Sequence, residues 1–148
     1  MGRLPLSVLA LGAVLEGKHE YTIVDGNVDR NALHTLREVF RENRSADVLA
    51  VSVMPGTQML NAIHHSKQLK KEFSDLTILW GGYFPSMHTD SVLNSEYVDY
   101  VLRGQSERPI IDFLATRGDG LALQAINNLS YRHENKLHHN PEYPIFDP

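Results

Sequence analysis

Val48-Leu49-Ala50-Val51-Ser52-Val53 is an apolar run interrupted by one serine, and Met54-Pro55-Gly56-Thr57-Gln58 follows it directly. A short apolar run without polar alternation is typical of a strand buried on both faces of a parallel sheet. A second such run, Leu76-Thr77-Ile78-Leu79-Trp80, ends at Gly81-Gly82. Residues 57 to 73 lie between the two runs and have helical periodicity, with Leu60 among the inward positions. The sequence therefore predicts a strand–helix–strand unit with parallel strands.

The same alternation extends in both directions from this unit. Further helices are expected near residues 5–16, 31–40, 89–94 and 107–115, and further strands at 21–25 and 98–102. This order predicts an α/β fold: a doubly wound, Rossmann-like or flavodoxin-like domain over residues 1–120, with a mainly parallel sheet and helices on both faces. Residues 121–139 are expected to add a helical turn and a small β-hairpin. The proline-rich residues 140–148 are expected to be a linker toward an absent catalytic domain.

The N-terminal end of this pattern is unusual for a doubly wound domain. Such domains usually open with a hydrophobic strand at the centre of the sheet, but this chain opens with the apolar helix at 5–16. The first strand is therefore expected to be missing. A sheet without it would expose a hydrophobic edge that a second copy of the chain could cover, which favours a homodimer.

Composition excludes several classes of protein. The 148 residues carry 14 Lys and Arg against 18 Asp and Glu, so the net charge of −4 gives no reason to expect nucleic-acid binding. There is no cysteine, which excludes disulfides, a thiolate nucleophile and a cysteine-held iron–sulfur cluster on this chain. The apolar run from Leu4 to Leu15 is shorter than the ~20 residues that span a bilayer, and no secretion signal follows it. We expect a cytoplasmic protein with no membrane association.

Three loops fall at the carboxyl ends of predicted strands, where open α/β sheets bind their ligands. They are residues 52–58, 81–86 and 104–107. The first and third lead into helices, whose N-termini favour anions such as phosphate. Gly81-Gly82 permits a ligand to approach the backbone closely. Each glycine taken alone is also explained by turn geometry.

Other candidate sites have weaker support in the sequence. His64 and His65 are adjacent on a helix, so their side chains diverge and cannot chelate one metal together. Trp80 is expected in the core, and Tyr83 is expected to contact a ligand or a partner domain. The motifs of zinc proteases, P-loop proteins, serine hydrolases and dinucleotide-binding domains are all missing.

Taken together, the loops resemble those of a known family. Ser52-Val53-Met54 followed by Gly81-Gly82 resembles the S-x-L…GG pattern of cobalamin-binding domains, with Met in place of Leu. The order of stretches along almost the whole chain resembles the N-terminal cobalamin (B12)-binding domain of cobalamin-dependent radical SAM enzymes. The resemblance implies that the corrin of cobalamin lies at the carboxyl edge of the sheet and its nucleotide tail in a glycine-lined groove.

The resemblance also implies which residues contact the cofactor. The S-x-L loop would lie against the dimethylbenzimidazole tail, the paired glycines would lie beside the nucleotide loop, and the family's G-x-x-E segment falls on Gly104 and Glu107. The implied cofactor-binding residues are Ser52, Met54, Pro55, Gly56, Thr57, Gly81, Gly82, Tyr83, Gly104 and Glu107. No residue is implied as a metal ligand or as catalytic.

The chain departs from the family in two ways. The D-x-H-x-x-G motif, whose histidine ligates cobalt in some members, would fall on Pro5, Ser7 and Ala10. No axial histidine is therefore expected. A radical SAM domain needs a C-x-x-x-C-x-x-C cluster site, so the iron–sulfur cluster and S-adenosylmethionine would belong to the absent part of the parent enzyme. The resemblance implies a fragment that binds cobalamin without catalysing a reaction, from a parent enzyme similar to the methyltransferases.

Two other interpretations remain open at this point. The chain can be a cofactor-free α/β module for docking or dimerisation, which the missing strand and the missing axial histidine favour. It can also be a flavodoxin-like domain that binds another phosphate-bearing ligand at Gly56-Thr57.

Overall fold

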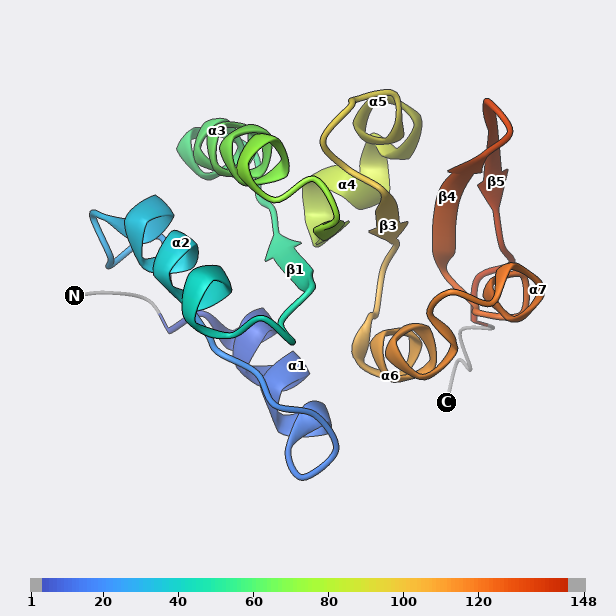
Figure 1. Ribbon diagram of the computed structural model, residues 1–148. Helices are drawn as coiled ribbons and strands as arrows, with labels where there is room; N and C mark the ends of the chain where they lie inside the picture. Colours follow the sequence, from blue (N-terminus) through green and yellow to red (C-terminus); the bar gives the residue numbers. More distant parts are fainter. Residues whose placement is uncertain (1–3, 144–148) are drawn as a thin grey trace.

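A five-stranded sheet forms the centre of the protein in the computed structural model, which describes residues 4–143 (Figure 1). The first three strands are parallel, and the last two form an antiparallel hairpin that continues the same sheet. In spatial order the strands are β1 (Val48–Ser52), β2 (Thr77–Gly81), β3 (Tyr100–Leu102), β4 (Leu129–His133) and β5 (Lys136–His139).

Helices cover both faces of this sheet. Figure 1 shows α1 and α6 on one side, with α2, α3 and α5 on the other. The helices are α1 (Leu6–Leu15), α2 (Ala32–Glu42), α3 (Thr57–Glu72), α4 (Tyr83–Met87), α5 (Thr89–Leu93), α6 (Glu107–Thr116) and α7 (Gly120–Leu123).

Alternate residues of the central strand β2 supply the two halves of the core. Ile78 and Trp80 pack with α2, α3 and α5 on one face, whereas Leu79 packs with α1 and α6 on the other. Successive strand residues point to opposite faces, so a strand that is apolar at every position must be covered twice. The predicted doubly wound fold and its C-terminal hairpin are thus confirmed.

The predicted strand at residues 21–25 is wrong. The segment contains no β-strand, and the sheet begins at β1. A strand needs a neighbour for its backbone hydrogen bonds, and the described chain provides none here. Instead, the side chains of Tyr21 and Ile23 lie against α1, where a Cβ added to Gly12 would be 3.1 Å from each of them.

One local prediction was also wrong, because tertiary packing overrides helical periodicity. Leu60 was expected to face inward, but it is 62% exposed near the start of α3. Further along this helix, the Lys70 ammonium donates to Asp99 and to the carbonyl of Leu76. Asn31 precedes α2 without a side-chain capping bond. The Gly81-Gly82 loop leads directly into α4.

The edge strand β1 and the helix α1 are less buried than expected. Ala50 is exposed in the middle of β1, although this strand was predicted to be covered on both faces. An α-helix that is apolar all round is normally enclosed, but only Gly12 and Leu15 of α1 are buried. The apolar surface around β1 and α1 is therefore only partly covered within residues 4–143.

Trp80, predicted to lie in the core, is buried and its indole N–H has one polar partner. The indole Nε1 donates to Ser66 Oγ on α3 at 3.0 Å, and Ser66 is itself fully buried. A buried donor without a hydrogen-bond partner destabilises the folded state, because it has given up its bond to water and gained none in return. This bond therefore links α3 to β2 at one defined register.

Replacing Ser66 with alanine should lower the free energy of unfolding by about 1–3 kcal/mol, because the indole N–H of Trp80 loses its acceptor. Trp80 is the only tryptophan of the chain, so its fluorescence reports unfolding in urea. Ser91→Ala, at an exposed position of α5, is the control and should leave the urea midpoint unchanged. Equal midpoints for both variants would contradict the assigned role of the bond.

Candidate functional site

The loops after β1 and β2 are bonded to each other at the carboxyl edge of the sheet. The Val53 N–H donates to the carbonyl of Gly81 at 2.8 Å, and the Phe84 N–H donates to the carbonyl of Val53 at 3.2 Å. Val53 is fully buried, whereas Met54 immediately after it is 47% exposed. The chain thus turns from core to surface within one residue at this junction.

Gly82 lies at the closest point between these two loops. A Cβ at this position would be 3.0 Å from both N and O of Val53 and 3.3 Å from Ser52 Oγ. Its φ of +98° also lies in the region that favours glycine. A Cβ added at Gly81, by contrast, would have its nearest neighbouring atoms at 3.6 and 3.7 Å, which is ordinary van der Waals contact. The fold therefore favours glycine strongly at 82, whereas a Cβ at 81 would fit without a clash.

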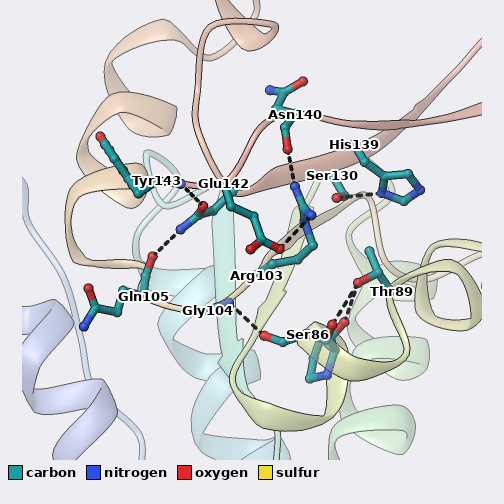
Figure 2. Close-up of polar contacts among 12 residues, drawn as sticks. Ser86, Thr89, Arg103, Gly104, Gln105, Ser130, His139, Asn140, Glu142 and Tyr143 are labelled. Carbon is teal, nitrogen blue, oxygen red and sulfur yellow. Dashed lines mark hydrogen bonds and ion pairs between the residues drawn. The ribbon is translucent and has the colours of Figure 1, made fainter. Parts of the chain in front are cut away.

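The loop after β3 joins the same edge through a serine hydroxyl. The Gly104 N–H donates to Ser86 Oγ at 2.9 Å (Figure 2). That hydroxyl in turn donates to the carbonyl of Gly82 at 2.7 Å. Gly104 has a φ of +61°, which favours glycine there as well. One serine of α4 thus holds the second and third loops together.

The N-terminal helix reaches this edge too. Ser7 Oγ of α1 and Ser52 Oγ share a hydrogen bond of 3.1 Å. Ser7 is the residue on which the histidine of the D-x-H-x-x-G motif would fall. The structure therefore places a hydroxyl, bonded to the serine of the S-x-L motif, where that histidine would stand.

The structure brings the residues predicted to bind the cofactor to one edge, although their role there stays a prediction. Met54, Pro55, Gly56 and Thr57 form an exposed turn into α3, and Tyr83 is 59% exposed at the start of α4. Glu107 is exposed at the first residue of α6.

Sequence reasoning missed two residues that organise this edge, Ser86 and Ser7. The only signal for Ser86 is its place four residues after Gly82, the spacing at which a helical serine bonds back to a carbonyl. Ser7 gave no signal beyond its alignment with the motif histidine. Both act through contacts between loops that are distant in sequence.

The chemistry of the edge suits a large uncharged ligand. Residues 52–58 and 81–86 contain hydroxyl, amide and apolar side chains but no charged group. Within residues 4–143, no group of three or more His, Cys, Asp or Glu residues could hold a metal ion. The corrin of cobalamin carries its own metal and has neutral amides at its periphery, so these residues fit it without ligating the cobalt.

A separate polar hollow of about 290 Å³ lies beside the first loop. It is lined by residues of the 26–32 turn and by Asn61 and His65 of α3. Gln58 borders it by donating to Asn27 Oδ1 at 2.9 Å. Burial, and to a lesser extent the neighbouring His64, lowers the pKa of His65. The hollow is at the low end of the range for small-molecule pockets and is too small to enclose a corrin.

No helix between residues 4 and 143 has the length and apolar content needed to cross a membrane.

The two adjacent glycines should respond differently to alanine. Gly82→Ala should lower the free energy of unfolding by at least about 2 kcal/mol, because its Cβ meets the Val53 backbone and its φ becomes strained. Gly81→Ala should change it by less than about 1 kcal/mol, because its Cβ meets only ordinary contacts. Urea titrations followed by tryptophan fluorescence compare the two. Equal losses would contradict this geometry.

Known proteins share both the sequence pattern and the fold. The family model of the B12 binding domain matches residues 4–114. The anaerobic magnesium-protoporphyrin IX monomethyl ester cyclase of Synechocystis sp. is 23% identical over 137 residues, which cover 90% of this chain and 27% of the cyclase.

Two solved structures have the same fold. The cobalamin-dependent S-adenosylmethionine radical enzyme OxsB, with aqua-cobalamin and S-adenosylmethionine bound, matches with a TM-score of 0.81 and 21% identity. That match covers 98% of this chain and 20% of OxsB. The radical S-adenosylmethionine methyltransferase TsrM from Kitasatospora setae matches with a TM-score of 0.73 and 19% identity, over 95% of this chain and 28% of TsrM.

The chain spans less than a third of the length of each of these relatives. The family model, in contrast, covers well over half of this chain, from α1 into α6. Together with the glycine-lined edge formed by the loops after β1, β2 and β3, this match shows that the chain belongs to the B12-binding domain family.

Proposed function

We propose that this chain holds cobalamin across the edge formed by residues 52–58, 81–86 and 104–107. The observation that carries the proposal is the junction at Gly82, where the loops of the S-x-M and GG motifs are in direct contact. The first two loops are preformed and carry no charged side chain, so the corrin binds against them without a cost for ordering loops. Because the edge is open, this chain would cover only one side of the cofactor.

Individual residues have distinct roles in this proposal. The Ser52 hydroxyl and the backbone of Gly81 receive the nucleotide tail, and the apolar surfaces of Met54 and Tyr83 contact the corrin. Gly104 and Glu107 border the site from the third loop. Bound cobalamin supplies a cobalt ion that can carry a methyl group. Ser7, whose hydroxyl is already paired with Ser52, stands at the sequence position of the histidine that ligates cobalt in other members of the family, and it would not ligate the cobalt.

The parent protein is proposed to be a cobalamin-dependent radical SAM enzyme. Its catalytic domain would hold the iron–sulfur cluster and S-adenosylmethionine, because this chain has no cysteine. The magnesium-protoporphyrin cyclase, OxsB and TsrM support this proposal by similarity. Residues 140–148 would lead toward that domain. We also propose that the parent protein is cytoplasmic.

Changing the exposed Met54 to lysine should reduce cobalamin binding at least tenfold, because a charge then has to be desolvated under the corrin. The chain is mixed with hydroxocobalamin and desalted, and retained corrin absorbance is recorded. Leu121→Lys is the matched control, because Leu121 is 80% exposed on α7. No retained cobalamin in the unchanged protein, or equal retention by Met54→Lys, would contradict the proposed site.

A second candidate function, dimerisation, is favoured by the free edge of β1. Asp47 O and Val53 N bond to β2. Because successive residues of a strand direct their N–H and C=O groups to opposite sides, the backbone groups of Val48, Ala50 and Ser52 point away from β2. The described chain has no strand beside them. A second copy of the chain would satisfy these groups by pairing edge to edge.

Replacing Ala50 with proline tests this second candidate. Proline removes the Ala50 N–H and is tolerated on the open side of an edge strand. If two copies pair through β1, the wild-type chain sediments as a dimer and Ala50→Pro as a monomer in analytical ultracentrifugation. A wild-type monomer at all concentrations would rule the candidate out.

A further inference from the structure

Asn128, in the turn that leads into β4, joins two segments that are far apart in sequence. Its side-chain amide donates to the carbonyl of Gln105 at 3.0 Å, and its Oδ1 accepts from the Tyr143 N–H at 2.8 Å. Its backbone N–H donates to Pro141 O at 2.9 Å, and its carbonyl accepts from the Arg103 N–H at 2.9 Å. Asn128 is only 5% exposed. It thus bonds twice to the loop after β3 and twice to the segment that leaves the hairpin.

That exit segment, residues 140–143, is extended but firmly attached. The Arg103 guanidinium donates to the carbonyl of Asn140 and to the carboxylate of Glu142, the latter at 3.2 Å (Figure 2). The side-chain amide of Asn140 is buried and donates to the carbonyls of Leu123 and Ile126 at 2.7 and 2.8 Å. The part of the predicted linker that the structure describes is therefore bonded to the domain.

The Asn128 side chain is not needed for the turn itself. Its φ of +64° is in the left-handed region, which glycine adopts more readily than asparagine. Glycine would therefore suit this backbone conformation better, and the presence of asparagine is explained by the hydrogen bonds of its side chain. One of those bonds reaches the carbonyl of Gln105, and the N–H of the neighbouring Gly104 donates to Ser86, which in turn donates to the carbonyl of Gly82. The exit segment is thus connected to the proposed cobalamin edge by hydrogen bonds on both sides of the Gly104–Gln105 backbone.

We propose that Asn128 is a positioning residue that couples the exit segment to the cobalamin site. It fixes the backbone of Gly104 and Gln105 in the arrangement that receives the cofactor, and it fixes Tyr143 at the same time. This inference rests on the proposed cobalamin site. Coupling between two sites is reciprocal, so cobalamin bound at the edge also stabilises the attachment of residues 140–143 to the domain.

The test compares Asn128→Gly with Asn135→Gly in the 148-residue chain. Both asparagines have positive φ, but Asn135 lies in the exposed β4–β5 turn. Asn128→Gly should bind hydroxocobalamin about five- to tenfold more weakly, the effect of losing one or two neutral hydrogen bonds. Asn128→Asp keeps the acceptor for Tyr143 and loses the donor to Gln105, so the Tyr143 amide should stay protected while cobalamin affinity falls.

Amide hydrogen exchange supplies a readout that does not depend on cobalamin. In the ligand-free protein, Asn128→Gly should speed exchange at Gly104 and Tyr143 together, and Asn135→Gly should affect neither. Unchanged exchange at Gly104 overturns the inference even if no cobalamin binds at all. Wild-type protein that fails to bind cobalamin overturns the proposed function alone. Wild-type affinity in Asn128→Gly overturns the positioning role.

Discussion

The contact between Gly82 and the backbone of Val53 is the constraint on which this site depends. It holds the two strand ends so close together that a Cβ at 82 would lie only 3.0 Å from two backbone atoms, which would have to move to admit it. The bonds of Val53 to Gly81 and of Phe84 to Val53 follow from this approach. The hydroxyls of Ser52 and Ser86 are then placed at the same edge. A single residue without a side chain thus sets the shape of the surface offered to the cofactor.

The sheet explains why so many distant segments meet there. Three parallel strands end at one edge, so the residues that follow them become neighbours whatever their separation in sequence. The antiparallel hairpin adds a fourth element, because Asn128 and Arg103 bring the exit segment back beside the loop after β3. The proposed cofactor loops and the exit segment therefore share one hydrogen-bonded framework.

The strands and helices with strong patterns could be predicted from sequence, and those that depend on distant partners could not. The apolar runs of β1 and β2 and the periodicity of α3 are local signals, as are the turn residues of the hairpin. Residues 21–25 have the composition of a strand but no neighbour to pair with. Leu60 follows the helical pattern but has no element covering it. In both cases, tertiary context decides the outcome.

The site could be predicted in part for the same reason. The three loops follow from the positions of strand ends, and the glycines from the resemblance to a known family. The bonds through Ser7, Ser86 and Asn128 join side chains to atoms far along the chain, so no local pattern indicates them. The need for glycine at 82 but not at 81 likewise depends on a neighbouring loop.

Hydrogen exchange with and without hydroxocobalamin tests the central claim most directly, because it locates the bound cofactor on the chain. The account predicts slower exchange in residues 52–58, 81–86 and 104–107, and no change in the β4–β5 turn. Protection confined to another surface, such as the hollow beside Asn61 and His65, would contradict it.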